Sequence, residues 1–173
     1  VDWMIKVENA CFRWNKNDPL LLHIPKFRVS CGERVFIRGP SGSGKTTFLN
    51  LLGGVSIPET GEVSIMGTNM SALSSAGRDS FRAEHIGYIF QMFNLIPYLS
   101  VIENVTLPCR FSATRRQRAL SQAKTLEGEA KRILSGLELD VTSIASQPVS
   151  HLSIGQQQRV AAARSIIGSP ELV

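Results

Sequence analysis

The sequence has few cysteines, few charges and no long apolar run. Its three cysteines, Cys11, Cys31 and Cys109, are far apart and form no CxxC pair, so neither a disulfide framework nor a zinc knuckle is indicated, and a reducing cytosol is the expected environment. No apolar stretch approaches the roughly 18 residues that a membrane helix needs, so we expect no bilayer span. The N-terminus has no basic patch followed by an apolar stretch, and no secretory signal is therefore expected.

The composition is that of a folded domain. Hydrophobic residues make up 43% of the 173 residues, which is enough to bury a core and excludes a disordered tail. Lys and Arg number 19 against 14 Asp and Glu, giving a formal charge of +5. At roughly 100 to 200 residues per domain, this length predicts one domain with a possible subdomain.

The pattern along the chain changes from β to α. Short apolar and alternating stretches within residues 3–14 and 20–38, including 35–37, predict strands joined by turns, and 61–67 predicts a hairpin-like piece. Residues 45–52 predict a helix that stops at a pair of glycines, and 86–90 are apolar enough for a buried strand. From about Val101 the sequence predicts a helical insertion. Its apolar face comprises Ala119, Leu120, Ala123, Leu126, Ala130, Ile133, Leu134 and Leu137, with Arg115, Arg116, Arg118, Lys124, Lys131 and Arg132 off that face.

A phosphate-binding loop is the first motif. The run Gly39, Pro40, Ser41, Gly42, Ser43, Gly44, Lys45, Thr46 fits G-x-x-x-x-G-K-[ST] between a predicted strand and a predicted helix, and Thr47 follows it. Glycines let successive backbone N–H groups point at phosphate oxygens, and the helix N-terminus adds its positive dipole end. Lys45 is then expected to bridge the β- and γ-phosphates, and Thr46 to offer its hydroxyl to Mg²⁺. The alternative is a glycine-rich turn that merely connects a strand to a helix.

The second motif lies near the end of the chain. Ser153 and Gln156 form a capping box ahead of the helical run 157–167, in which Val160, Ala163 and Ile167 mark a packed stripe. An ordinary capped surface helix explains Ser153 and Gln156. It does not explain Gly155, because glycine in a helix is about 1 kcal/mol less favourable than alanine.

Three features in this order resemble the ATP-binding cassette (ABC) ATPases. The run Leu152-Ser153-Ile154-Gly155-Gln156 resembles their LSGGQ signature, Tyr88-Ile89-Phe90-Gln91 looks like their Q-loop, and Trp14 matches the aromatic that stacks on adenine. The resemblance implies an α/β fold: a P-loop NTPase core with an N-terminal antiparallel β subdomain and a helical insertion. It divides residues 1–173 into a β subdomain and P-loop core (1–92), a helical subdomain (93–150), and the signature with its following helix (151–173).

The resemblance also implies a function. The chain would be the ATP-binding subunit of a transporter, an ATP hydrolase that uses ATP and Mg²⁺ and works as a homodimer with a transmembrane permease subunit. It would be cytoplasmic and peripheral to the inner (plasma) membrane, with no nucleic acid expected. The implied catalytic residues are Lys45, Gln91, Ser153 and Gly155. Nucleotide contacts would include Trp14, the loop 39–47 and Gln156, and Thr46 and Gln91 would hold the metal. Residues 92–105 look most like the lipoprotein-releasing and macrolide-exporter ATPases.

Two departures from the family pattern stand out. Ile154 replaces the first glycine of the signature, whereas Ser153 and Gly155, which contact phosphate in the family, are present. The family's Walker B aspartate, catalytic glutamate and switch histidine would lie beyond Val173. We therefore expect a cassette cut short, with negligible hydrolysis by this chain alone and uncovered apolar edges where a central strand would pair.

Several alternatives stay open at this point. A glutamine at a strand end, such as Gln91, is also typical of an ordinary surface residue. Trp14 fits a core aromatic equally well. The basic group Arg115, Arg116 and Arg118 is more typical of a solvated helix face than of a lipid-headgroup site. Exposed Phe93, Leu95, Ile96 and Tyr98 would form a groove for a coupling helix, or else belong to the core. A soluble ABC protein acting on ribosomes or DNA, and a non-catalytic nucleotide-binding module, are the competing functions.

Overall fold

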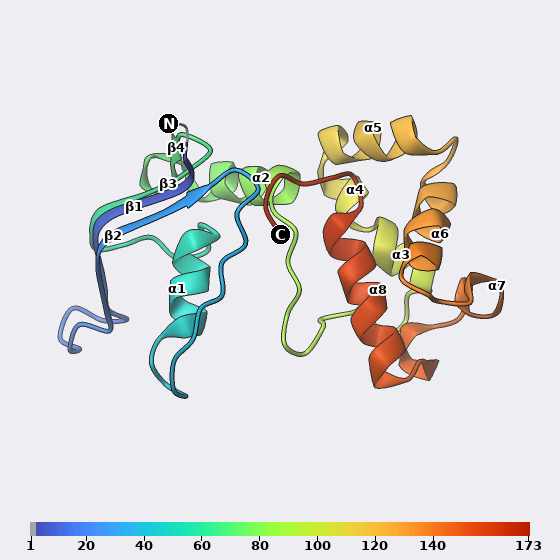
Figure 1. Ribbon diagram of the computed structural model, residues 1–173, viewed down its shortest axis with the longest axis horizontal. Helices are drawn as coiled ribbons and strands as arrows, with labels where there is room; N and C mark the ends of the chain where they lie inside the picture. Colours follow the sequence, from blue (N-terminus) through green and yellow to red (C-terminus); the bar gives the residue numbers. More distant parts are fainter. Residues whose placement is uncertain (1–2) are drawn as a thin grey trace. The chain divides into compact units, whose positions relative to one another are not determined.

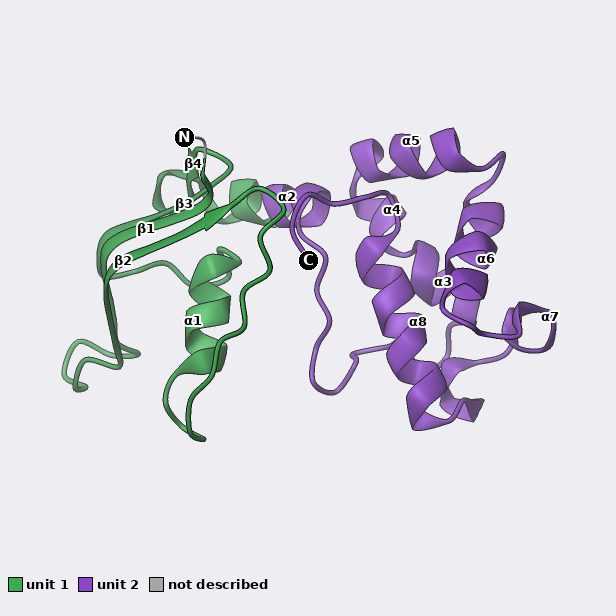
Figure 2. Cartoon of the chain, viewed as in Figure 1, with its two compact units in different colours: residues 1–79 green, residues 80–173 purple. Residues whose placement is uncertain are grey.

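The computed structural model describes residues 3–173. The chain folds as two compact units, Val1–Asp79 and Ser80–Val173, coloured separately in Figure 2. Helix α2 (Ser75–His85) runs from one into the other. This division follows the packing of the backbone. The functional division at residues 92 and 150 stays a prediction.

Unit 1 is built on a four-stranded antiparallel sheet in the order β2-β1-β3-β4 (Figure 1). The strands are β1 (Trp3–Phe12), β2 (Leu22–Ser30), β3 (Thr60–Ile65) and β4 (Thr68–Asn69). The turn between β3 and β4 places Met66 and Gly67 at φ 50° and 77°, the pair of positive values that a tight type I′ hairpin requires. The predicted antiparallel β subdomain and hairpin are confirmed.

A bulge in β1 explains its burial pattern. Ile5 and Val7 are buried, but the next buried residues are Ala10 and Phe12, so the two-residue period slips by one. The slip falls at Asn9, which has φ 49°, where the pairing of β1 with β3 is irregular between Glu8 and Cys11. Gly61 lies against this bulge, because a Cβ atom there would come 2.2 Å from the Asn9 carbonyl oxygen.

Helix α1 (Lys45–Leu52) packs beside the sheet, and its bounds are those predicted. Leu51 and Leu52 are buried, and the ring of Phe48 meets that of Phe27 edge-on at 5.1 Å. Gly53 ends the helix, as expected. The short helix η1 (Met70–Ala72) and α2 follow β4, so most of the Ser/Ala-rich segment 71–80 is helical.

Unit 2 is a bundle of helices (Figure 1). Its helices are α3 (Val101–Thr106), α4 (Pro108–Phe111), α5 (Ala113–Gln122), α6 (Leu126–Gly136), α7 (Val141–Ile144), η2 (Val149–His151) and α8 (Ile154–Ile166). Helix α8 packs against α3 and α6. The core contains much of the predicted apolar face, including Ala119, Ala130, Ile133 and Leu134. That face is shared by two helices rather than one, because the chain turns at 123–125.

Two predicted strands are wrong as regular elements. Residues 35–37 are extended but unpaired, and Phe36 is 88% exposed. Of residues 86–90, only Ile86 pairs, in a single parallel bridge to Leu172. An apolar segment becomes a strand only when neighbouring backbone accepts and donates its hydrogen bonds. Within residues 3–173 only the segment at Leu172 does this, and only at the start of 86–90.

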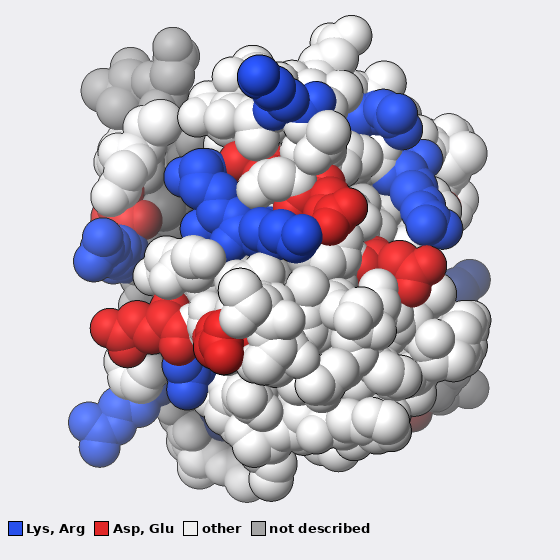
Figure 3. All heavy atoms as spheres, turned by 90° about the vertical axis from the view of Figure 1, so that its right-hand side faces the viewer, with Lys and Arg blue, Asp and Glu red and all other residues white. Residues whose placement is uncertain are grey.

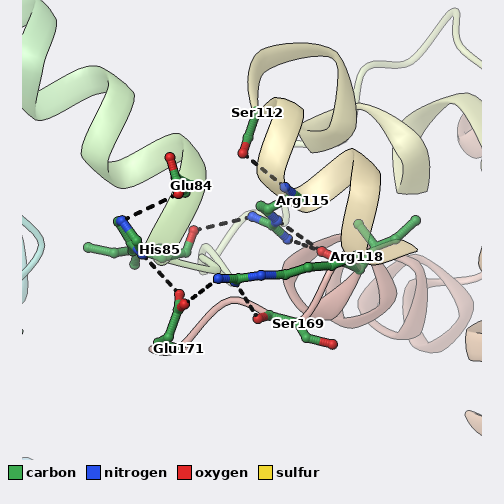
Figure 4. Close-up of polar contacts among 9 residues, drawn as sticks. Glu84, His85, Ser112, Arg115, Arg118, Ser169 and Glu171 are labelled. Carbon is green, nitrogen blue, oxygen red and sulfur yellow. Dashed lines mark hydrogen bonds and ion pairs between the residues drawn. The ribbon is translucent and has the colours of Figure 1, made fainter. Parts of the chain in front are cut away.

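The basic group on α5 is not a solvated face, which corrects the sequence interpretation. Arg115 is only 2% exposed, and Arg118 pairs with Glu171 at 2.7 Å; only Arg116 is fully exposed (Figure 4). On the face of the molecule shown in Figure 3, basic and acidic side chains alternate. Such mixing gives no strong field of one sign.

The structure also tests the predictions for the cysteines and for membrane spans. Cys11, Cys31 and Cys109 are all free thiols, as predicted. No helix in the described part of the chain is both long and apolar enough to cross a membrane.

The carboxylate of Glu171 lies between two donors, Arg118 at 2.7 Å and His85 at 3.0 Å (Figure 4). Burial raises the pKa of this carboxyl, but the hydrogen bonds from Arg118 and His85 outweigh burial and lower the pKa to about 2. A carboxyl whose pKa is lower in the folded chain stabilises the fold above the unfolded pKa of about 4.3, and this stabilisation fades as the pH falls toward 2.

We therefore expect Glu171→Gln to lower the free energy of unfolding by about 1 kcal/mol at pH 7. The difference from the wild type should shrink between pH 4.5 and pH 2, because the wild-type carboxylate itself becomes neutral there. Urea unfolding at pH 7 and pH 3 measures this. Glu138→Gln, at an exposed carboxylate without an ion pair in residues 3–173, is the control. A difference that is the same at both pH values would contradict the assignment.

Candidate nucleotide-binding site

The loop 39–44 has the backbone shape that its glycines permit. Gly42 and Gly44 have φ 78° and 88°, in the left-handed region that side chains rarely adopt. At Gly44 a Cβ atom would also lie 2.8 Å from the Leu22 side chain. The loop closes through a bond from the Ser43 N–H to the Pro40 carbonyl at 3.2 Å. The positive φ therefore favours glycine at Gly44, and any side chain there would also make the Leu22 side chain shift.

Lys45 folds back over this loop. Its Nζ donates to the carbonyl oxygens of Gly39 at 2.8 Å and Pro40 at 2.7 Å. Helix α1 begins at Lys45, and its N-cap, Gly44, supplies no side-chain hydrogen bond to the first-turn N–H groups. An uncapped N-terminus beside an ammonium group is suited to an anion such as phosphate.

Three further predicted contacts lie in unit 1. Thr46 is exposed, whereas Thr47 is buried. Trp14 is 61% exposed and touches Phe12 edge-on at 5.0 Å. The alternative that Trp14 is a core aromatic is therefore wrong, and its outer ring face is free to stack on a flat ligand.

Gln91 lies in unit 2, at an exposed turn. The Phe93 N–H bonds back across it to the Phe90 carbonyl at 2.9 Å. Phe93 and Asn94 have φ 59° and 47°, and their carbonyls accept hydrogen bonds from Arg164 of α8. The adjoining segment is tied to the fully buried Asn104 amide, which bonds to backbone groups of Ile96, Leu99 and Ser100.

The signature residues form the N-terminus of α8. The capping box is confirmed: the Gln156 N–H donates to Ser153 Oγ at 3.3 Å, and the Ser153 N–H donates to Gln156 Oε1 at 2.9 Å. Val160, Ala163 and Ile167 are all buried, as the stripe predicts. A Cβ atom built on Gly155 meets nothing within 4 Å, and Ser153, Ile154 and Gly155 are all exposed. Packing within the chain therefore does not require glycine at position 155.

The segment expected to receive a coupling helix is only partly exposed. Tyr98 and Met92 are highly exposed, but Phe93 and Ile96 are half-buried and Leu95 packs against the core of unit 2. The groove interpretation thus loses Leu95, which belongs to the core.

The predicted site residues divide between the two units: Trp14 and 39–47 in unit 1, and Gln91, Ser153, Gly155 and Gln156 in unit 2. Within unit 2, α8 begins at the signature residues, and its Arg164 contacts the loop that follows Gln91. Sequence reasoning missed Arg164, although a signal was available. Positions 160, 163, 164 and 167 form one helical face, and a charged residue on a buried stripe needs a partner.

Comparisons with known proteins agree with these motifs. The profile of a family described as "ABC transporter" matches residues 22–173. The chain is similar to the lipoprotein-releasing system ATP-binding protein LolD of Chromohalobacter salexigens, with 37% identity over 172 residues that cover 98% of this chain and 69% of that protein. The LolD protein of Syntrophotalea carbinolica is 36% identical over 173 residues, covering 98% and 72% respectively.

Two solved structures are similar over 96% of this chain and 71% of theirs, each with a TM-score of 0.77 and 36% identity. One is the dimeric structure of MJ0796, described as a bacterial ABC transporter cassette. The other is a post-hydrolysis dimer of the same cassette bound to ADP and Pi.

Proposed function

Because this chain belongs to the ABC transporter family and is an ATP-binding component of that family, we propose that its loop 39–46 and its signature turn 153–156 are two halves of a site that binds ATP between two copies of the chain. The observation that carries this proposal is the open first turn of α8. Ser153 and Gly155 are exposed, and within residues 3–173 nothing lies within 4 Å of a Cβ atom built on Gly155.

The triphosphate would lie on the loop. Lys45 Nζ now bonds to two neutral carbonyls, whereas phosphate oxygens carry negative charge and would add the attraction of opposite charges to each hydrogen bond. We propose that Nζ exchanges these carbonyls for the β- and γ-phosphates, while the first-turn N–H groups of α1 donate to the remaining oxygens. Trp14 would stack on the adenine.

The donors present suit Mg²⁺, which prefers oxygen ligands and binds along with substrate phosphates. Thr46 offers a hydroxyl and Gln91 an amide oxygen, and both residues are exposed. The ion would neutralise charge on the phosphates. We propose Thr46 and Gln91 as its protein ligands.

The second copy would contribute Ser153, Gly155 and Gln156 to the γ-phosphate, since a helix N-terminus attracts an anion. Closing two copies on ATP, and opening them after hydrolysis, would move a transmembrane permease. The chain would then lie at the cytoplasmic face of the inner membrane. The similarity to LolD favours the lipoprotein-releasing type of transporter. We expect no nucleic acid among the partners of the chain.

Gly155→Glu tests the shared site. Glutamate in the first helical turn should leave the free energy of unfolding unchanged or raise it slightly. It replaces glycine, a poor helix former, and its negative charge is favourable near the positive end of the helix dipole. Its charge would repel the partner's γ-phosphate, so ATP-dependent dimerisation should weaken about tenfold or more. Analytical ultracentrifugation with Mg-ATP measures this.

Gly136→Glu is the matched control, because a Cβ atom at Gly136 also meets nothing within 4 Å and the residue is likewise helical. It should dimerise like the wild type. Dimerisation unaffected by Gly155→Glu would show that the signature turn lies outside the interface, and the shared site would be abandoned.

A further inference from the structure

Arg164 is a buried cation that binds a loop rather than an acid. The residue is 8% exposed, and its two terminal nitrogens donate to the Asn94 carbonyl at 2.6 Å and the Phe93 carbonyl at 2.5 Å. Burial lowers the pKa of its guanidinium. No carboxylate among residues 3–173 pairs with it. Burying a charge against neutral groups is unfavourable, so packing alone does not explain an arginine here.

The two acceptors are held in an unusual conformation. Phe93 and Asn94 both have left-handed φ values, which residues with side chains seldom adopt. Such a pair persists only where the surroundings fix it. The planar fork of an arginine can place a separate nitrogen on each of two adjacent carbonyls, whereas a lysine has a single nitrogen for both.

The loop is held from both ends. Arg164 fixes residues 93 and 94, and the buried Asn104 amide fixes residues 96–100. Gln91 lies inside the turn that the Phe93 N–H closes by donating to the Phe90 carbonyl, and Arg164 holds Phe93, the last residue of that turn, by its carbonyl. The position of Gln91 therefore depends on a side chain of α8, the helix that begins at the signature turn.

We propose that Arg164 is a positioning residue for Gln91, which ties the Gln91 loop to the helix that carries Ser153 and Gly155. The metal role of Gln91 in this inference rests on the proposed function, whereas the fixing of the loop does not. Arg164 touches neither nucleotide nor metal in this scheme and acts through the backbone of Phe93 and Asn94.

The chain supplies a matched control in Arg159. It lies on the same helix and also donates to two adjacent carbonyls, Leu137 at 3.4 Å and Glu138 at 3.0 Å, and Glu138 likewise has a positive φ of 59°. Arg159 donates from a single nitrogen and is exposed, so it is a second arginine of α8 that holds two carbonyls, at a loop far along the chain from Gln91.

Hydrogen–deuterium exchange on the full chain tests the fixing of the loop without any nucleotide. Arg164→Lys should speed exchange at the amides of Phe93 and Asn94 about tenfold, the effect of losing one charge-assisted hydrogen bond. Exchange in the sheet of unit 1 and at Glu138 and Leu139 should not change. Arg159→Lys should show the reverse pattern. Equal acceleration everywhere in Arg164→Lys would mean global destabilisation and would overturn the proposal.

Titration with ATP, in MgCl₂ and in EDTA, tests the link to Gln91. Arg164→Lys and Gln91→Ala should lose the same part of the gain in ATP affinity that Mg²⁺ gives the wild type. The variant that carries both substitutions should lose no more than either alone. The ATP affinity in EDTA should stay unchanged. A normal Mg²⁺ effect in Arg164→Lys beside a reduced one in Gln91→Ala would overturn the proposal. If the wild type binds no ATP, the proposed function fails, and the exchange data alone decide whether Arg164 fixes the loop.

Arg164→Met is a second variant, for the case in which Arg164→Lys does not fold. It keeps an apolar stem of similar length, and replacing a buried charge by a packed apolar group is often neutral for stability. It should release Phe93 and Asn94 as the lysine variant does. If neither variant folds, as judged by circular dichroism, Arg164 serves the fold as a whole and the proposal is wrong.

Discussion

Replacing Lys45 by alanine is expected to weaken ATP binding to the chain at least about a hundredfold. The substitution removes two charge-assisted hydrogen bonds to phosphate, each contributing about 1.5–3 kcal/mol, and every 1.4 kcal/mol is a factor of ten in affinity. Isothermal titration calorimetry with ATP measures the loss. Binding should survive Lys26→Ala, at an exposed lysine of β2 in the same unit.

The structure offers a competing role for Lys45, which this variant also tests. Its Nζ bridges two carbonyls of the loop, so the side chain could serve only to shape the loop. In that case Lys45→Ala would lower the melting temperature and leave the affinity for ATP near that of the wild type. That pair of results would remove Lys45 from the phosphate site.

Features that depend on neighbours in the sequence were predictable. The bounds of α1 follow from helix formers between a glycine loop and Gly53, and the capping box of α8 follows from Ser153 and Gln156 three residues apart. The phosphate loop is likewise a local motif, because its glycines set its own backbone. In each case the hydrogen-bond partners lie within a few residues.

Features that depend on distant partners were not predictable. Residues 35–37 and 86–90 have strand-like composition, but a strand needs another strand beside it, and composition does not supply one. Charge patterning placed Arg115 on a solvated face, since arginine is seldom buried. Its acceptors are backbone carbonyls up to 52 residues away, which leave no mark in the residue types of the sequence.

Arg115 gives the largest stability effect that we expect. Its guanidinium makes five hydrogen bonds: two to the Ile167 carbonyl at 2.6 and 2.9 Å, and one each to the carbonyls of Ser165 at 2.9 Å, Arg164 at 3.3 Å and Ile86 at 3.4 Å. Most of these acceptors are at the C-terminal end of α8, where the helix dipole is negative and helical carbonyls lack partners. Burial lowers the pKa of Arg115, but an arginine stays charged. The side chain is therefore an internal cap that joins α5 to the end of α8.

Arg115→Ala should lower the free energy of unfolding by about 3–5 kcal/mol, because it leaves several buried carbonyls without donors and opens a cavity. Arg115→Met fills the space but supplies no donor, so it should recover only the cavity part, about 1–2 kcal/mol. Urea unfolding of both, with the exposed Arg116→Ala as the control, separates the two contributions. Should Arg115→Met be as stable as the wild type, the carbonyls at the end of α8 do not need a donor, and the cap is a packing contact alone.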